Sequence, residues 1–399
     1  MRSITRAGMA LAALAALFVI TAGSASASAR PFHHFAPSRS HHHPRPPFHL
    51  PPPPPRHGRP VFVQTDNPAG NQVVAYDQAA NGSLTQAGTY NTGGLGGVLE
   101  GSVVDHLASQ GSLAYDGDNG LLYAVNAGSN TVSVFSVSGD RLELRQVIGS
   151  GGAFPVSVAV DHGLVYVLNA EQGGSVQGYR AVLGHLLPIP GSARALGLDP
   201  TATPQFVNTP GQVAFSPDGS QLIVTTKANG SAIDVFGVRA FGRLTPTPVV
   251  NSEPGAVPFA VTFDQRGNLA VSQAGTNSVA SYALHGDGTV TPISSVPTGQ
   301  AATCWIVRAG SVLYASNAGS GTFSSVLSGS GGQLTFLGNT ETDGGTVDAA
   351  VSASSPFLYV QAGAAGIVDE FSIGAGGTTS KIGSVTVPGA VGGEGIVAL

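Results

Sequence analysis

One short pattern recurs seven times along this chain and constrains its fold more than any single residue. Each copy contains an apolar strand, a turn rich in Asn and Gly, and a second strand in which apolar and polar residues alternate. The copies occupy residues 61–76, 121–137, 164–179, 222–236, 269–282, 313–326 and 358–371. Because a unit this short cannot bury its own core, neighbouring units must stack on one another.

The spacing of the copies favours a β-propeller. The second residues of their first strands are Phe62, Tyr123, Tyr166, Ile223, Ala270, Tyr314 and Tyr359. Four of the six gaps between them are 43 to 47 residues, close to the roughly 40–50 residues of a four-stranded blade. The other two gaps, of 61 and 57 residues, indicate insertions near residues 93–110 and 192–211. We predict an all-β, seven-bladed β-propeller of four-stranded blades over residues 61–399, with six or eight blades as the alternatives.

Residues 212–245 show how one blade is encoded. β-Branched and aromatic residues predict strands over 212–215, 222–225 and 232–238, and Arg243 is expected to open the fourth strand. Between the first two strands lies the turn Ser216-Pro217-Asp218-Gly219. Pro presets φ, Asp bonds back to the backbone, and Gly tolerates positive φ.

The two ends of the predicted propeller complement each other. The first copy starts at its second strand, at Val61, whereas residues 395–399 have the pattern of a missing first strand. We therefore expect the C-terminal strand to pair with the first blade and close the ring. A closed ring has no free sheet edge to recruit other chains, which favours a monomer.

Residues 1–29 have the layout of a secretory signal peptide. Arg2 and Arg6 precede an apolar run over residues 7–23, and small residues follow at 25–29. A membrane anchor is the alternative, but the run is short for a spanning helix. We expect this peptide to be cleaved and the protein to be secreted, either extracellular or at the cell surface. We expect the mature chain not to insert into a membrane.

Residues 30–60 form a separate segment that is rich in Pro and His. Proline lacks an amide donor and fixes φ, so we predict an extended, disordered tail. Seven of the eleven histidines lie in this tail. It is therefore either a solvated spacer or a loose site for Zn²⁺, Ni²⁺ or Cu²⁺.

Charge changes sharply after residue 60. Ten basic and 22 acidic side chains follow, which gives that part a formal charge of −12. A domain this acidic repels nucleic acid and anionic membranes, so we exclude both as its partners. Cys304 is the only cysteine, which rules out an intramolecular disulfide, and its apolar neighbours predict a buried thiol.

Candidate site residues gather on one predicted face of the propeller. That face carries the loops between second and third strands and the connections into the inner strands, around the central channel. The candidates for binding are His106, Asn126, Asn169, Arg194 and Glu394. The Asn residues can instead cap turns, and the acidic residues of these loops can bind Ca²⁺ or stay solvated, although no calcium-loop spacing is present. The sequence contains no G-x-S-x-G elbow, no H-E-x-x-H, no paired C-x-x-C and no phosphate loop, so we assign no catalytic residue, no metal site and no cofactor.

Two stretches carry a family resemblance. Residues 122–135 (LYAVNAGSNTVSVF) and 214–219 (AFSPDG) are similar to blade motifs of the seven-bladed propeller lactonase family, which includes bacterial 6-phosphogluconolactonase and fungal carboxymuconate cyclase. The resemblance covers most of residues 61–399 and implies this fold and lactone chemistry. Related YVTN-type propellers share the blade motifs without that chemistry.

The functional signature that the resemblance implies is altered at three places. Where enzymes of this group resemble H-S-V-x-x-D, residues 111–116 begin with Gly111. Where they resemble G-P-R-H, residues 209–212 end in Gly211 and Gln212, and where they resemble N-E-L, Lys227 replaces the acid. Glu171, one blade earlier, is a candidate for a displaced substitute. The imidazole, guanidinium and carboxylate that would bind an acidic substrate and move a proton are therefore missing from the matching positions.

Two functions are compatible with these residues. The first is a secreted, lactonase-like propeller that acts as a binding or scaffolding module for a small molecule or an extracellular protein. The alternative is an exported lactonase that hydrolyses or forms a small carboxylated lactone at a rearranged channel-mouth site, with His106, Arg194 or Glu394 reaching the channel.

Overall fold

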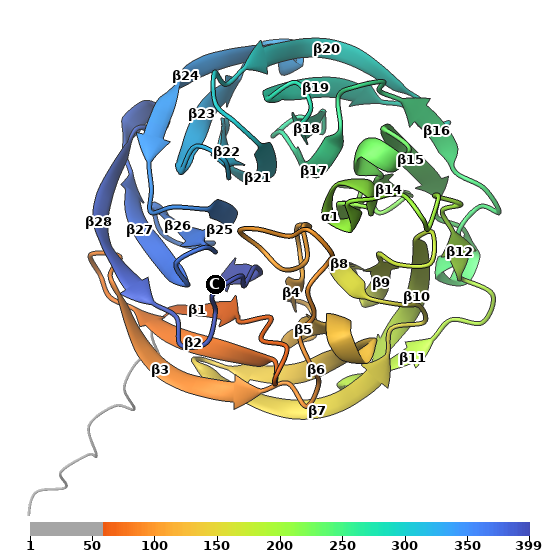
Figure 1. Cartoon of the computed structure of the whole chain (residues 1–399), viewed down its shortest axis with the longest axis horizontal. Helices are drawn as coiled ribbons and strands as arrows, with labels where there is room; N and C mark the ends of the chain where they lie inside the picture. Colours follow the sequence, from red (N-terminus) through yellow and green to blue (C-terminus); the bar gives the residue numbers. More distant parts are fainter. Residues whose placement is uncertain (1–58) are drawn as a thin grey trace, which may run out of the picture. The chain divides into compact units, whose positions relative to one another are not determined.

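A ring of seven β-sheets makes up residues 59–399, the part of the chain described by the computed structural model (Figure 1). Each sheet is an antiparallel blade of four strands, and one blade has a fifth, short strand. The predicted all-β, seven-bladed propeller is thereby confirmed. The predicted signal peptide and the tail up to residue 58 lie outside the described residues.

The blades are numbered along the chain, and the strands of each are given from the axis outwards. Blade 1 contains β29 (Ile396–Ala398), β1 (Arg59–Gln64), β2 (Gln72–Gln78) and β3 (Leu84–Asn91). Blade 2 contains β4 (Leu113–Asp116), β5 (Leu121–Asn126), β6 (Thr131–Ser138) and β7 (Arg141–Gly149). Blade 3 contains β8 (Pro155–Asp161), β9 (Leu164–Asn169), β10 (Ser175–Val182) and β11 (His185–Pro188), and β12 (Arg194–Ala195) also pairs with β10.

The second half of the ring follows the same plan. Blade 4 contains β13 (Gln212–Phe215), β14 (Gln221–Thr225), β15 (Ala232–Gly237) and β16 (Val249–Ser252). Blade 5 contains β17 (Pro258–Phe263), β18 (Leu269–Gln273), β19 (Ser278–Leu284) and β20 (Val290–Pro297). Blade 6 contains β21 (Thr303–Ala309), β22 (Val312–Asn317), β23 (Thr322–Ser328) and β24 (Leu334–Glu341). Blade 7 contains β25 (Thr346–Val351), β26 (Phe357–Ala362), β27 (Ile367–Ile373) and β28 (Thr379–Thr386).

Helical structure in residues 59–399 is limited to single turns. These are α1 (Gln205–Asn208) and the 3-10 turns η1 (Ala127–Ser129), η2 (Lys227–Asn229), η3 (Ala240–Gly242), η4 (Ser330–Gly332) and η5 (Ala375–Gly377). Within this range, no helix has the length and apolar character that crossing a membrane requires.

Both ends of the propeller meet in blade 1, as predicted. β29 pairs antiparallel with β1, with Phe62 opposite Val397. The Leu399 amide donates to the Pro60 carbonyl at 3.0 Å, just beyond the paired residues. Figure 1 shows the C-terminus beside β1, near the middle of the ring. β29 therefore supplies the innermost strand that the N-terminal part of blade 1 lacks.

A tyrosine in the second strand ties several blades to the blade that follows. The hydroxyls of Tyr166, Tyr314 and Tyr359 are buried and donate to the carbonyls of Gly242, Gly377 and Gly82, at 2.6, 3.0 and 2.8 Å. Each glycine lies in the turn before the outer strand of the next blade and has a positive φ of 76° to 91°. A Cβ there would press into the preceding blade, for example within 2.4 Å of the Phe357 ring at Gly82. The repeated tyrosine thus marks a joint between blades as well as a strand.

Blade 4 differs from the prediction at its outer strand, which begins at Val249 instead of Arg243. Between these positions only Leu244 makes a bridge, to Val238. Pro246 and Pro248 lack the amide hydrogens that a ladder needs, which explains the delayed start.

Candidate functional site

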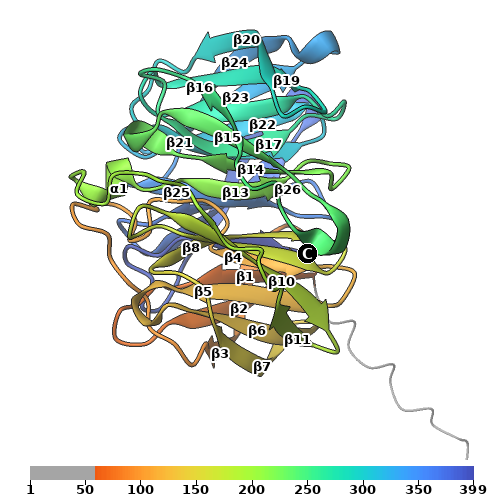
Figure 2. The ribbon, with the colours of Figure 1, turned by 90° about the vertical axis from the view of Figure 1, so that its right-hand side faces the viewer.

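Two insertions cover one end of the ring. The first comprises residues 93–110, between β3 and β4, and the second comprises residues 192–211, which contain β12 and α1. Both project from the face that carries the loops between second and third strands, here called the mouth face; α1 marks it in Figure 2. In Figure 1 the segment leading into β4 crosses the middle of the ring.

The end of the first insertion closes the centre of the ring. The side chain of Gln110 donates to the Ile306 carbonyl at 3.0 Å and accepts from the Ile306 amide at 2.8 Å. The indole N–H of Trp305 donates to the Ser109 carbonyl. On the other side, the Ser109 hydroxyl donates to the Val156 carbonyl at 2.8 Å. Buried main chain therefore spans from blade 3 to blade 6 where an open propeller would have its channel.

A pocket of about 510 Å³ lies beside this closure, at the mouth of blades 4, 5 and 6. Most of its wall is apolar: Val104 and Ala108 come from the first insertion, Phe206 from the second, and Phe259 and Trp305 from inner strands. The rings of Phe259 and Trp305 pack with centroids 4.8 Å apart. Asp105 and Lys227 are the charged residues of the lining, which also includes Asn277 and Cys304.

Lys227 joins both insertions to blade 4. It lies in η2, between β14 and β15, with a positive φ of 47° and an exposed fraction of 1 %. Its ammonium donates to the carbonyls of Ala108 at 2.7 Å and Phe206 at 2.6 Å, and lies 5.3 Å from the centre of the Phe259 ring. Burial lowers the pKa of Lys227 to about 8, although attraction from Asp105 opposes this shift.

A carboxyl pair, Asp105 and Glu394, lies next to this lysine. Burial, with repulsion from Asp105 and Asp66, raises the pKa of Glu394 well above its usual value. The Ser109 hydroxyl contacts both Glu394 Oε1 and the Val156 carbonyl, but it has a single proton to donate. Burial and the neighbouring carboxylates therefore favour the neutral form of Glu394.

Asp105 is the better candidate for the charged member of the pair. Burial also raises its pKa, but the hydrogen bond with Glu394 and the attraction of Lys227 favour its ionised form. Only 5 % of the residue is exposed, and its Oδ2 has no hydrogen-bond partner. Asp105 therefore brings an unused acceptor to the pocket.

Two more buried carboxyls surround the axis. Asp66 Oδ2 accepts from the Glu394 amide at 2.8 Å, and Asp348 Oδ1 accepts from the Ala349 amide at 2.9 Å. Burial raises the pKa of each to about 7. Within residues 59–399, no three His, Cys, Asp or Glu side chains are grouped so that they could hold a metal ion.

The structure separates the five predicted candidates. Glu394 lies at the centre, and the half-buried His106 is nearby, with Nδ1 3.1 Å from the Asp66 carbonyl. Asn126 and Asn169 are buried at the ends of β5 and β9. Asn126 Nδ2 donates to Ser133 Oγ at 2.8 Å. Asn169 Nδ2 donates to the Ser150 carbonyl at 3.3 Å. Asn126 Oδ1 accepts from Asn71 of blade 1 at 3.1 Å, and Asn169 Oδ1 has no partner among the described residues, so neither side chain caps a turn through a backbone amide.

Arg194 lies away from the pocket. It belongs to β12, at the periphery of the ring in Figure 1. Its guanidinium donates to the carbonyls of Leu244 and Thr245, both at 2.7 Å, and to Gly191 and Ala193. Two of the four bonds hold the irregular stretch before β16 and the other two hold the residues before β12, so this side chain has a structural role.

The three altered signature positions each make a contact that holds the fold together. Gly111 has a φ of 87° and accepts from the Val158 amide through its carbonyl at 2.8 Å. The Gln212 side chain is buried and accepts from the Val261 amide at 2.6 Å. Lys227 is engaged with the insertions. Sequence reasoning missed Lys227 as a site residue, although its place in a recurrent turn and the scarcity of lysine in the chain were visible signals.

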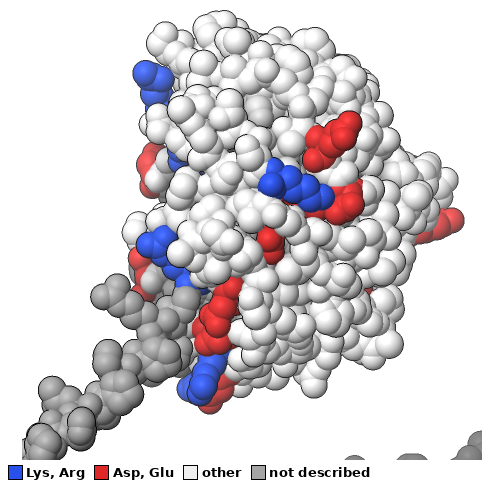
Figure 3. All heavy atoms as spheres, turned by 90° about the vertical axis from the view of Figure 1, so that its left-hand side faces the viewer, with Lys and Arg blue, Asp and Glu red and all other residues white. Residues whose placement is uncertain are grey.

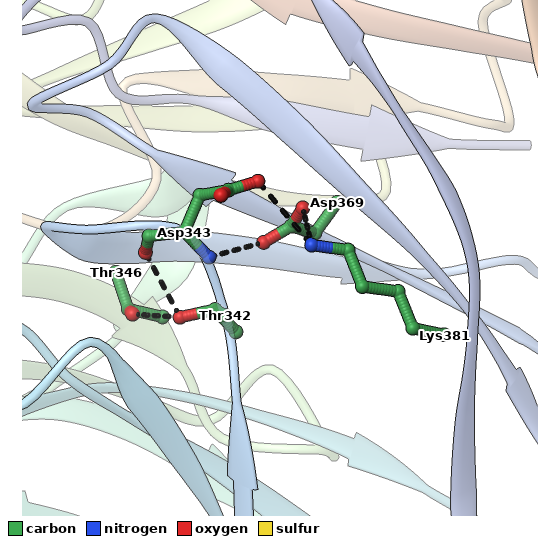
Figure 4. Close-up of polar contacts among 5 residues, drawn as sticks. All are labelled: Thr342, Asp343, Thr346, Asp369 and Lys381. Carbon is green, nitrogen blue, oxygen red and sulfur yellow. Dashed lines mark hydrogen bonds and ion pairs between the residues drawn. The ribbon is translucent and has the colours of Figure 1, made fainter.

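A second polar cluster lies at the mouth side of blade 7 (Figure 4). Lys381 Nζ lies 2.7 Å from Asp369 Oδ1 and 3.3 Å from Asp343 Oδ2, and the Asp343 amide donates to Asp369 Oδ2 at 2.8 Å. The buried Asp369 is thus neutralised by a half-exposed lysine. Because its charged groups are paired with each other, this cluster holds strands together and offers little to a ligand.

Solved structures with this fold perform different tasks. A periplasmic gluconolactonase of Pseudomonas aeruginosa is 18% identical, with 86% of this chain and 99% of that one covered and a TM-score of 0.68. A protein of Lactobacillus plantarum is 20% identical, with coverage of 86% and 99% and a TM-score of 0.69. Virginiamycin B lyase of Staphylococcus aureus is 12% identical, with coverage of 70% and 85% and a TM-score of 0.51. At these identities the likeness shows the fold alone.

Sequence comparison is more specific. Among curated proteins, none matches this chain significantly. Residues 92–391 match the family described as lactonase, 7-bladed beta-propeller, and this match spans both insertions and all the pocket residues. The chain belongs to the seven-bladed β-propeller lactonase family.

Proposed function

We propose that this protein is an exported binding module that takes up a small, largely apolar molecule in the mouth pocket and does not turn over lactones. The observation that carries the proposal is the position of Lys227. It stands where the resemblance implies a carboxylate, and its ammonium is bonded to two main-chain carbonyls. A lysine held in this way closes the site instead of moving a proton.

The closed centre supports the same function. Ser109 and Gln110 occupy the axis, and Gly111 and Gln212 supply neither an imidazole nor a guanidinium there. Next to them the pocket keeps the size and apolar wall typical of small-molecule sites.

Export and the choice of partner are part of the proposal. The leader-like residues 1–29 and the periplasmic location in the name of one structural relative support export. Figure 3 shows a side of the ring on which charged side chains are sparse and the two signs are interspersed. With an excess of acidic residues after position 60, a small neutral molecule suits this protein better than a nucleic acid.

Binding of the neutral apolar dye Nile red tests the proposal. We expect its fluorescence to rise with the purified protein and to fall back in Ala318→Phe, which fills the pocket. Ala80→Phe is the matched control, because Ala80 is exposed in the turn before β3 of blade 1, on the face opposite the mouth face. Equal dye binding by both variants would contradict pocket binding.

A lactonase with a rearranged site is the second candidate, and the unpartnered Oδ2 of Asp105 favours it as the available base. Hydrolysis of glucono-δ-lactone by the purified protein separates the two functions. We expect no acceleration over the uncatalysed rate. Turnover that disappears in Asp105→Asn would overturn the binding module and establish the enzyme.

A further inference from the structure

The pocket combines an apolar wall with two opposite charges. Asp105 and Lys227 are its charged lining residues, and they attract each other. Among the described residues no ion pair joins them directly, because Lys227 Nζ is bonded to the Ala108 and Phe206 carbonyls instead. A ligand in the pocket therefore meets a donor and an acceptor that both line it and are not paired with each other.

Lys227 and Asp105 each keep a hydrogen-bonding position without a partner. An ammonium has three N–H donors, and Lys227 uses two of them on main-chain carbonyls. Asp105 accepts from the Ala108 amide and hydrogen-bonds with Glu394, while its Oδ2 stays without a partner in a residue that is 5 % exposed. A buried acceptor in this state is costly and favours a ligand that can donate to it.

Charge excludes two kinds of ligand head. A carboxylate or phosphate would be repelled by Asp105, the charged member of the carboxyl pair. An ammonium would be repelled by the ammonium of Lys227, which lines the same pocket. A neutral group that donates and accepts through one atom fits both partners, and a hydroxyl is such a group.

We propose that the pocket recognises a ring-bearing alcohol or phenol, whose hydroxyl donates to Asp105 Oδ2 and accepts from Lys227 Nζ while its ring lies against Phe259 and Trp305. This inference rests on the proposed binding function and adds the chemistry of the ligand. The volume of about 510 Å³ suits a molecule of two or three fused rings.

The chain contains its own reporter of this site. Trp305 is the only tryptophan, and it lines the pocket. Its emission should change when a ligand binds. Three probes share one apolar cage and differ only in the head group: 1-adamantanol, 1-adamantanecarboxylate and 1-adamantylammonium. We expect the alcohol to bind at least about tenfold more tightly than either ion at pH 7.5.

Two variants test the roles of the charged residues. Asp105→Asn should weaken binding of the alcohol about tenfold and strengthen binding of the carboxylate, since no negative charge then opposes Lys227. Lys227→Met should also weaken binding of the alcohol, but it should strengthen binding of the ammonium. Far-ultraviolet circular dichroism and the melting temperature check that both variants fold, and the ranking of the three probes on the unmodified protein tests the proposal without them.

The outcomes distinguish a failure of hydroxyl recognition from a failure of the proposed binding function. If all three probes bind with similar affinity, or an ion binds most tightly, hydroxyl recognition is overturned while the binding pocket stands. If no probe alters Trp305 emission and Nile red also fails to bind, the proposed function itself is wrong. An alcohol preference that is lost in Asp105→Asn supports both.

Discussion

Gln110 and Ile306 lie 196 positions apart and are joined by two hydrogen bonds across the centre of the ring. One side-chain amide satisfies both the amide hydrogen and the carbonyl of the same residue, so it replaces a β-strand partner. This contact holds the first insertion against blade 6 and forms the floor beside the pocket. The closed centre of this propeller therefore depends on a pair that no local pattern connects.

Replacing Gln110 by Ala should reduce the free energy of unfolding by about 1–3 kcal/mol, because the buried polar groups of Ile306 lose their partners. Chemical denaturation measured by circular dichroism would show this. Gln86→Ala is the control, since Gln86 is exposed on β3, and we expect a change below about 0.5 kcal/mol. Equal effects of the two substitutions would show that the closure contributes nothing to stability.

Tyr359→Phe removes the hydroxyl with which Tyr359 of blade 7 donates to the Gly82 carbonyl of blade 1. We expect a loss of about 1 kcal/mol, because the joint loses one buried hydrogen bond while its packing is kept. Thermal unfolding with a scanning calorimeter measures the effect. Tyr115→Phe serves for comparison, since the Tyr115 ring is half-buried in blade 2, and it should shift the melting temperature much less. A larger loss in Tyr115→Phe would argue against the inter-blade joint.

The buried carboxyl of Asp348 should make the protein less stable as the pH rises from about 4 to 7. Its pKa is near 3.8 when exposed and about 7 in the fold, so the folded state holds the proton more tightly over this interval. Stability is then highest below pH 4 with respect to this group and is lost as the pH approaches 7. Asp66 has a pKa raised to about 7 by burial and acts in the same direction.

Asp348→Asn should make the free energy of unfolding depend less on pH. We expect the stability of the variant, relative to the unmodified protein, to improve by roughly 2–4 kcal/mol between pH 4 and 8, as measured by urea denaturation. Glu143→Gln, at an exposed carboxyl on β7, should leave the dependence unchanged. A variant that stays parallel to the unmodified protein at every pH would mean that Asp348 ionises freely in the fold.

Lys381→Met should leave Asp369 buried without its cation and cost about 1–3 kcal/mol, a range reduced because the lysine is half-exposed (Figure 4). Adding Asp369→Asn to Lys381→Met should recover part of the loss, since no uncompensated buried charge then remains and Asp343 is half-exposed. Arg145→Met breaks the exposed pair with Glu143 and should cost below about 0.5 kcal/mol. A double variant that is less stable than Lys381→Met alone would contradict the pairing.

Much of the fold could be predicted because its signals are local. The turn at residues 216–219 and the apolar strands on either side depend on neighbouring residues, and the recurrence of Tyr123, Tyr166, Tyr314 and Tyr359 gives the period. The prediction for the fourth strand of blade 4 begins six residues too early, because it neglects Pro246 and Pro248, which lack amide hydrogens. Arg194 was placed on the ligand face, but the structure pairs its segment with β10 at the outer edge.

The sequence by itself determined seven blades, their order and the pairing of the C-terminus with the first blade, because each follows from strand period and turn chemistry within some 45 residues. Only the tertiary structure decided that the two insertions fold over the axis, that Lys227 is buried between them, and that Asp105 keeps a free acceptor in an apolar pocket. These features arise from contacts between residues a hundred or more positions apart, such as Lys227 with Ala108 and Gln110 with Ile306. Their free energy depends on burial and on competing partners, which exist only once the ring has closed.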